Sequence, residues 1–365
     1  MPQPSSPRWP IGKAHEAMAG GEIIPPSRRA GRVAYLFGSD EQHGRVYADG
    51  PALCNKGSTD IRLLRSDPED FVRIHIPGNF ARLKARPALH NVAVILNLVT
   101  DADVNPQVLL WAERILKPFA GRVLNRPAAV RASTRDSIAA TLAGMSGLLV
   151  PSVARFRGQA QLARAAIIRC GLHFPAILRI AGTHNGDIVG LIHDEQALFA
   201  AIRPEFTYLL TEFVDRPGTD GLYHKIRVLF FGDSAIVRHC LVSDMWNVHG
   251  ADRERVMAHH PGWIERERAL IAGGLAALPA TARATLEEVR RRISLDFFGI
   301  DFALLPDDRL LLFEANATMN FFPLSTHPAF AYAGAPVVAA ARAALDRLIA
   351  EGWNRPARVA SNQAA

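Results

Sequence analysis

The sequence contains few cysteines and no long apolar run. Only three of its 365 residues are cysteine, at positions 54, 170 and 240. They are too few and too scattered for a disulfide framework or a zinc site, which favours a reducing cytoplasm. No run approaches the roughly 18 apolar residues of a membrane-spanning helix, so no membrane partner is expected. The opening MPQPSSPRWPIGK lacks the apolar core of a signal peptide.

Basic residues are abundant but are not gathered into a block. The formal charge of +7 comes from arginines spread along the chain, with no basic stripe interleaved with aromatic residues. Nucleic-acid binding is therefore not expected. Positive potential also suits an enzyme that handles phosphates or acidic substrates. At this length, 49% hydrophobic and 21% charged residues predict a soluble globular protein with two or three lobes.

The most informative stretch is GIDFALLPDDRLLLFEANATM, residues 299–319. Alternating apolar residues, a Pro-Asp-Asp turn and a returning apolar run predict a β-hairpin. The hairpin places Asp301 across from Glu314 and Asn316, which point to the same side of the returning strand. Carboxylate and amide oxygens are ligands that Mg²⁺ accepts, together with nucleotide phosphates. The alternative is an ordinary hairpin with acidic ends in water.

The order D-F-x-L-L…F-E-x-N in this hairpin resembles the end of an ATP-grasp domain, in the glutathione-synthetase and RimK-like carboxylate–amine ligase branch. The resemblance implies that Asp301, Glu314 and Asn316 bind magnesium, as two ions, with Mn²⁺ as an alternative, between the phosphates of ATP. It also implies an α/β fold (an α+β grasp), with an N-terminal open-sheet pre-ATP-grasp lobe followed by a two-lobed ATP-grasp domain.

The expected organisation follows the chain in five parts, with helices at 104–119, 134–143, 159–170, 195–202, 261–273, 279–298 and 337–351. The parts are a flexible leader (1–30), a pre-ATP-grasp α/β domain (31–125), a first grasp lobe with a glycine-rich lid (126–205), a second lobe with the metal hairpin and a closing helix (206–352), and a flexible tail (353–365).

The first grasp lobe carries the expected phosphate-binding residues. The resemblance places a phosphate-binding lysine near the helix at 134–143, for which Ser133 is the expected cap, but this sequence has Arg135, with Arg131 as second choice. Residues 174–192 predict a strand, a small-residue loop and a strand, which resemble the family's lid. There Arg179 takes the place of a second lysine, and Gly182, Thr183, His184 and Gly186 form the loop. A plain hairpin turn is the alternative.

The strand at 208–214 resembles the family's adenine hinge. Glu212, Phe213 and Val214 are its expected members, whose backbone would bind the adenine edge. Asp220 or Asp215, just beyond, would accept a ribose hydroxyl. A simple edge strand is the alternative reading.

Two long strands at 221–232 and 234–243 predict a second hairpin. Lys225 and Arg227 share one face, which is unusual for a core strand and favours a face that looks onto phosphate. The resemblance makes Arg227 the catalytic clamp on an acyl phosphate and Lys225 its helper, against the alternative of an exposed cationic face. His239 is either a substrate contact or a structural residue, and the loop at 243–250, with Trp246, either faces substrate or simply packs.

Taken together, the resemblance implies an ATP-dependent ligase that joins a small-molecule or peptide carboxylate to an amine through an acyl phosphate. A small-molecule kinase on the same fold is one alternative. A non-catalytic nucleotide-binding regulatory module is another, favoured by arginines in place of both lysines. The sequence identifies neither substrate, and it leaves open whether the protein forms a homo-oligomer.

Overall fold

The computed structural model describes residues 33–41, 56–61, 63–64, 72–82, 87, 89, 92–183, 187–318 and 324–354. Their strands are β1 (Val33–Ser39), β2 (Val72–Pro77), β3 (Val94–Asn97), β4 (Arg122–Leu124), β5 (Leu148–Leu149), β6 (Val153–Arg157), β7 (Ala176–Ile180), β8 (Gly190–Ile192), β9 (Thr207–Glu212), β10 (Tyr223–Phe231), β11 (Ser234–Ser243), β12 (Phe297–Leu304) and β13 (Leu310–Asn316).

The α-helices of the same residues are α1 (Pro106–Leu116), α2 (Pro127–Arg131), α3 (Arg135–Leu142), α4 (Ala160–Cys170), α5 (Glu195–Ala201), α6 (Asp252–Arg255), α7 (Pro261–Gly273), α8 (Ala280–Arg292) and α9 (Ala335–Asn354). Short 3₁₀ turns are η1 (Phe80–Arg82), η2 (Met257–His259), η3 (Gly274–Ala277) and η4 (Pro328–Ala333). The expected leader lies outside the described residues, as does the expected tail beyond residue 354; its first two residues, 353 and 354, belong to α9.

The first sheet is parallel throughout, in the order β2-β1-β3-β4. Its strands are continuous apolar runs, as expected when both faces of a parallel sheet are covered. Helix α1 packs on one face through Val108, Leu109 and Ala112. This part of the chain is the predicted open-sheet unit.

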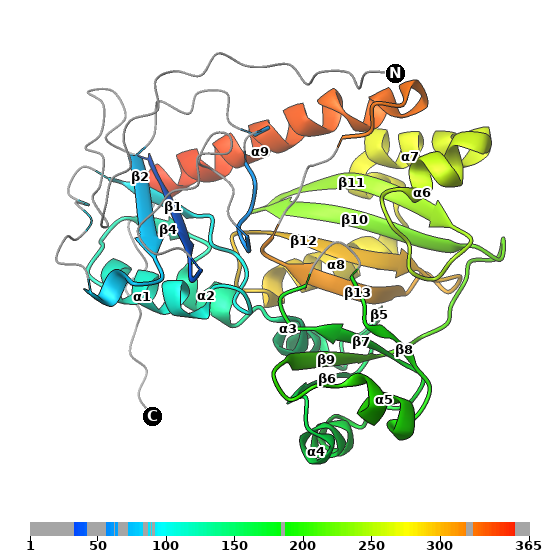
Figure 1. The fold of residues 1–365 in the computed structure, drawn as a ribbon. Coiled ribbons are helices and arrows are strands. Elements are labelled where there is room, and N and C mark those ends of the chain that lie inside the picture. The colour runs from blue at the N-terminus through cyan, green and yellow to red at the C-terminus, as the bar shows by residue number, and fades with distance from the viewer. Residues whose placement is uncertain are drawn as a thin grey trace, which may run out of the picture.

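A small antiparallel sheet follows, in the order β6-β9-β7-β8. Phe156, Leu178, Leu198 and Leu210 belong to its own apolar core. In Figure 1, α4 and α5 lie on the side of this sheet away from the large sheet. Strand β9 begins beyond the expected lobe boundary at 205/206, yet it pairs with β6 and β7, so the change of sheet falls between β9 and β10.

The large sheet has the order β11-β10-β12-β13-β5. One face packs on α7 and α8 through residues such as Phe298, Ile300 and Leu286. On the other face Leu229 and Phe231 join a core with α9. Strand β5, from the segment before the small sheet, pairs in parallel with β13. The sheet therefore joins segments that are far apart in the sequence.

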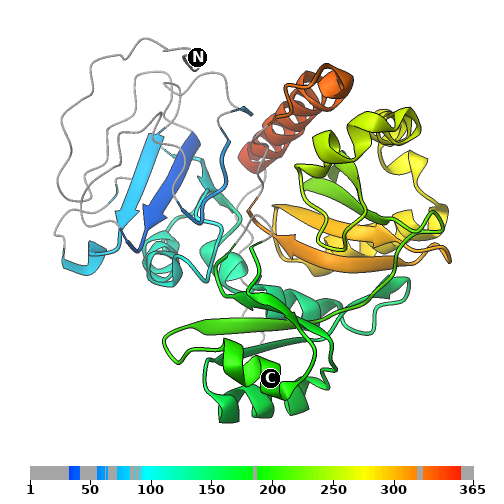
Figure 2. The same cartoon turned by 45° about the vertical axis from the view of Figure 1, so that its right-hand side comes forward.

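Helix α9 lies between the first sheet and the large sheet (Figure 2). By length and composition alone, the stretch Pro328–Gly352 is apolar enough to cross a membrane. In this fold its apolar residues, including Ala341, Leu345 and Ile349, pack against the two sheets. The helix therefore serves as the shared core between them.

Two predicted helices differ from the observed ones. The helix expected at 279–298 ends at Arg292, and Phe297 already begins β12 in the middle of the large sheet. A strand forms here in place of the helix because it buries both Phe297 and Phe298, one on each face of the sheet. Ser133 does not cap α3: its hydroxyl donates to the carbonyl of Val130 at the end of α2, a helix that was not predicted.

Candidate functional site

The hairpin of β12 and β13 brings two carboxylates side by side. Asp301 lies directly opposite Glu314, and Gly299 lies opposite Asn316. A bulge between Asp301 and Phe302 shifts the register just beyond this point. The predicted juxtaposition of the two acids is therefore present in the large sheet, next to β10.

These residues line a narrow hollow, whose walls are Arg227, Leu229, Gly299, Asp301, Glu314, Asn316 and Thr318. Thr318 was not predicted, although it continues the i, i+2 alternation from Glu314 and Asn316. Its hydroxyl lies 3.0 Å from that of Thr100, at the end of the first sheet. The first domain therefore touches the wall of the hollow directly.

Both acids face guanidinium groups. Arg227 binds Asp301 through two parallel contacts, Nε to Oδ1 at 2.5 Å and Nη2 to Oδ2 at 2.6 Å. Arg135 donates from Nη2 to Glu314 and from Nη1 to the carbonyl of Phe313, the latter at 3.0 Å. The Asn316 amide also donates to Glu314. The predicted cations and acids thus converge from α3, β10, β12 and β13.

Arg179, on β7 of the small sheet, lies near Glu314. Burial, and then the charge of Arg135, lower the pKa of Arg179 to about 10, while Glu314 opposes this shift. Among the described residues its guanidinium makes no hydrogen bond and no ion pair. A sheltered cation without a counterion is what an anionic ligand would neutralise.

Lys225 and His239 flank Arg227. The Lys225 ammonium donates to the carbonyl of Val248, and burial lowers its pKa although Asp301 lies close by. His239 lies opposite Arg227 in the register of β10 and β11. Burial, and then Arg227, hold the pKa of His239 well below its usual value, so its ring is neutral. Its Nε2 atom is buried and has no hydrogen-bond partner among the described residues.

The predicted hinge joins the small sheet to the large one. The Glu212 N–H donates to the carbonyl of Ser152 at 2.9 Å, and the Phe213 N–H donates to that of Pro175 at 2.9 Å. The N–H of Val214 donates to no described residue. The ring of Trp246, from the 243–250 loop, meets Phe213 edge-on with centroids 5.2 Å apart.

The remaining predicted residues are only partly engaged at the site. Asp220 accepts from the His224 ring at 2.9 Å, on an exposed turn, so its carboxylate already has a partner. At the start of the lid Gly182 has a positive φ of 78°, and Thr183 donates through its hydroxyl to the carbonyl of Ile180. His184 and Gly186 lie outside the described residues.

The donor set fits magnesium by type. The described residues contain no cluster of three or more His, Cys, Asp or Glu side chains suited to a metal ion. Two carboxylates and an amide oxygen are nevertheless a set that Mg²⁺ accepts, because this ion commonly completes its shell with water and phosphate oxygens. Asp301, Glu314 and Asn316 all line the one hollow, which is consistent with such a site.

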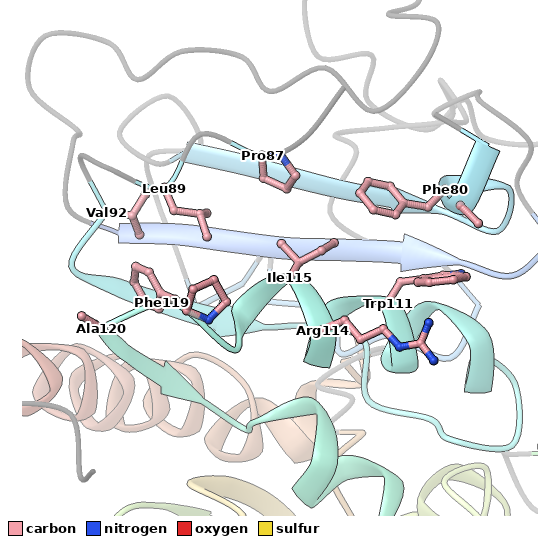
Figure 3. A pocket seen from close by; sticks show the side chains of 12 residues that line it. Phe80, Pro87, Leu89, Val92, Trp111, Arg114, Ile115, Phe119 and Ala120 are labelled. Atoms are coloured by element: carbon pink, nitrogen blue, oxygen red, sulfur yellow. The ribbon is translucent and has the colours of Figure 1, made fainter. Parts of the chain in front are cut away.

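A larger hollow of about 800 Å³, open to solvent, lies in the first domain (Figure 3). Its lining is mostly apolar and includes Phe80, Trp111 and Phe119. Among the described lining residues Arg114 is the one that is charged, with its guanidinium 4.8 Å from the centroid of the Trp111 ring. This hollow therefore lacks the paired acids and cations of the hairpin site.

No protein-family model and no curated protein matches the sequence. Solved structures of ATP-grasp enzymes are similar over most of the chain. A RimK-domain ATP-grasp protein from Sphaerobacter thermophilus is 17% identical, over 86% of this chain and 98% of that chain, with a TM-score of 0.47. The VanG D-Ala:D-Ser ligase of Enterococcus faecalis is 13% identical, over 88% of this chain and 99% of that chain, with a TM-score of 0.49. A D-alanine–D-alanine ligase from Bacillus anthracis, complexed with ATP, is 11% identical, over 89% of this chain and 97% of that chain, with a TM-score of 0.46. At these identities and with TM-scores of 0.47, 0.49 and 0.46, the similarities decide neither the family nor the substrate of this chain.

Proposed function

We propose that the protein is an ATP-dependent ligase that joins a carboxylate to an amine. The observation that carries this proposal is the convergence of Asp301, Glu314 and Asn316 with Arg135 and Arg227 around one hollow. Arg179 adds a sheltered cation that makes no hydrogen bond and no ion pair with a described residue. This combination suits a ligand that brings both divalent metal and several negative charges, as Mg²⁺-ATP does.

The nucleotide would lie between the hinge and the lid. The Val214 N–H is the hinge donor left available for the adenine edge, and the Phe213–Trp246 pair supplies an aromatic wall beside it. Backbone N–H groups around Gly182 and Thr183 would approach the phosphates, because small residues leave them accessible. Arg179 would then gain the anionic partner that the described residues do not give it.

Asp301, Glu314 and Asn316 would hold the magnesium, which when bound supplies positive charge beside the phosphates. Arg227 and Arg135 are engaged with Asp301 and Glu314 without nucleotide. On nucleotide binding these guanidinium groups would share or exchange their carboxylate partners for phosphate oxygens, which they can also bind in a bidentate manner. The ion pairs therefore keep the cations in place before the ligand arrives.

In the proposed reaction a substrate carboxylate oxygen attacks the γ-phosphorus of ATP, the bond to the bridging oxygen breaks, and ADP leaves. The amine nitrogen then attacks the acyl carbon, phosphate leaves, and loss of a proton from nitrogen gives the amide. Arg227 and Lys225 would stabilise negative charge on the transferred group, and more strongly in the transition state than in the ground state. The lid would exclude water from the acyl phosphate.

The test is calorimetric titration with Mg²⁺-ATP of the wild type, of the variant carrying Glu314→Ala and Asn316→Ala, and of Glu287→Ala as a control. Glu287 makes an exposed pair with Arg290 on α8, so its loss should leave binding unchanged. We expect micromolar binding by the wild type and a loss of about 100-fold in the double variant, because two metal ligands are removed. A wild type that binds no Mg²⁺-ATP would overturn the proposal.

Product analysis then separates the chemistries. A ligase supplied with a suitable carboxylate and amine releases free phosphate and forms an amide, whereas a kinase leaves a stable phosphorylated product. Binding without turnover across a broad set of carboxylates and amines would point instead to the regulatory module.

A further inference from the structure

Arg155, on β6 of the small sheet, contacts two carboxylates from two different parts of the chain. Its Nη1 and Nη2 atoms donate to the two oxygens of Asp103, at 2.7 and 3.0 Å. Its Nε atom donates to Asp136 at 2.9 Å. Asp103 lies between β3 and α1 of the first domain, and Asp136 lies in the first turn of α3. One guanidinium therefore ties together the first domain, the helix after it and the small sheet.

Asp103 is carried on a turn that is itself braced. The buried carboxylate of Asp101 accepts from the N–H of Asp103 at 2.7 Å and from that of Val104 at 3.1 Å. Next along the chain, the buried Asn105 side chain donates to the carbonyl of Lys56 at 2.9 Å. The turn at 101–104 thus presents Asp103 from a fixed backbone, which lowers the entropy lost on pairing.

The same turn also supports the lid. A Cβ atom at Gly182 would lie 3.0 Å from Cγ2 of Val104 and 3.5 Å from Cβ of Asp103. The small sheet therefore rests on the 101–104 turn at two points, the side chain of Arg155 and the backbone of Gly182. Both points hold the lid end of the small sheet against the first domain.

The second carboxylate leads to the candidate phosphate site. Asp136 is adjacent to Arg135, the residue that binds Glu314. The side chains of Arg155, Asp103 and Asp136 are 26%, 18% and 25% exposed, so solvent screens these ion pairs less than it screens fully exposed ones. The first turn of α3 is thus held by Arg155 through Asp136, while its Arg135 binds Glu314, which lines the hollow.

We infer that Arg155 is a positioning residue that latches the small sheet and its lid onto the first domain and fixes Arg135 at the phosphate site. The latch couples the first domain to the lobe that carries the lid. Its catalytic consequence rests on the proposed function, whereas the latch itself is a property of the protein without nucleotide. The two are therefore tested separately.

The first test is amide hydrogen exchange of the full chain without nucleotide, comparing the wild type with Asp103→Asn. The control is Arg164→Gln, which breaks a pair with Glu195 inside the small lobe and leaves the latch intact. We expect exchange across β6, β7 and the flanks of the lid to rise about tenfold in Asp103→Asn only, because charge-assisted bonds to a fixed carboxylate are lost. Equal exchange in all three proteins would overturn the latch.

Two further variants, Asp103→Glu and Gly182→Ala, test the latch independently of Asp103→Asn. Asp103→Glu retains the carboxylate and should restore most of the protection. A merely structural role of the side chain at position 103 would not predict this recovery. Gly182→Ala leaves the ion pairs in place but forces a side chain against Val104 at a positive φ, and should raise exchange at the lid. If Asp103→Asn does not fold, Gly182→Ala decides: unchanged exchange at the lid rejects the latch.

The link to the nucleotide is then measured by titrating Asp103→Asn with Mg²⁺-ATP. We expect binding about tenfold weaker than in the wild type, although Asp103 is not placed at the hollow. Increased exchange with unchanged affinity would retain the latch and reject its coupling to the phosphate site. Absence of binding by the wild type would reject the proposed function and leave the exchange result standing.

Discussion

Arg227 and Asp301 occupy directly paired positions of β10 and β12, and their side chains form a two-contact ion pair beside the hollow. The Asp301 side chain is only 7% exposed. Although burial alone would lower the pKa of Arg227, the adjacent carboxylate raises it above its usual value. The proposed catalytic cation and a proposed metal ligand therefore neutralise each other in the protein without ligand.

Removing the Arg227 guanidinium should make the stability of the protein depend on Mg²⁺ binding at Asp301. We expect Arg227→Met to lower the free energy of unfolding by about 3 kcal/mol, because Asp301 is left buried without its counterion. Millimolar Mg²⁺ should then recover part of the loss, more than it stabilises the wild type. Urea unfolding with and without Mg²⁺ measures both effects. Arg290→Met, at an exposed ion pair, is the control, and the absence of any Mg²⁺ effect would argue against metal binding at Asp301.

Arg179 should show opposite effects on stability and binding. Its pKa of about 10 lies below the usual value of an arginine, so at pH 8 the folded state holds a charge that burial and Arg135 disfavour. We expect Arg179→Met to be more stable by about 1–3 kcal/mol at pH 8, and the gain to shrink above pH 10, where folded wild type sheds the proton. Affinity for Mg²⁺-ATP should fall about tenfold. Chemical unfolding at pH 8 and above pH 10 measures the stability, and calorimetry measures the affinity for Mg²⁺-ATP. A variant that loses both stability and affinity would contradict the prediction.

Asp136 gives the latch a defined acid dependence. Burial would raise its pKa, but its hydrogen bond to Arg155 outweighs this, and the pKa lies below the usual 3.8. A carboxyl with a lowered pKa contributes stability that is present above pH 3.8 and is lost as the pH falls through the folded value. Asp136→Asn should cost about 1–2 kcal/mol at pH 7 and progressively less below pH 4. A cost that is constant with pH would show that charge is not involved.

Asn125 should be critical for joining the first sheet to the large one. It has a positive φ of 54°, and its side chain accepts from the N–H groups of Asp296 and Phe297 and donates to the carbonyl of Phe297. Asn125→Ala should cost about 3–5 kcal/mol, because buried backbone groups lose their partners. Asn125→Gly should cost about 1 kcal/mol less, since glycine tolerates this backbone. Chemical unfolding of both variants separates the two causes, and equal costs would contradict the backbone contribution.

Much of the fold follows from local patterns in the sequence. Continuous apolar runs identified the buried parallel strands, and alternation around Pro306-Asp307-Asp308 identified the hairpin and its register. The end of α8 was harder, because Leu295, Phe297 and Phe298 continue an apolar pattern that suits a helix equally well. Only their burial between β10 and β13 decides for a strand. A two-residue strand such as β5 carries no periodicity at all.

The site could be predicted where its residues share one element. Asp301 and Glu314 are placed by hairpin register, and Lys225 with Arg227 by strand alternation. The contacts of Arg155 with Asp103 and Asp136 join residues 52 and 19 positions apart, and no local pattern announces them. The partner of each arginine is likewise set by tertiary packing, since a guanidinium satisfies its donors with whichever carboxylate the fold brings near.

The bond between the Glu212 N–H and the Ser152 carbonyl means that the chain enters and leaves the small sheet at adjacent points. Residues 153–211 are in this sense an insertion with neighbouring ends, carrying their own apolar core. Such a unit can be lengthened, shortened or exchanged between chains without moving the strands of the large sheet, because its removal leaves two ends that a short connection can bridge. The fold thereby separates the part that can change from the part that holds the paired acids.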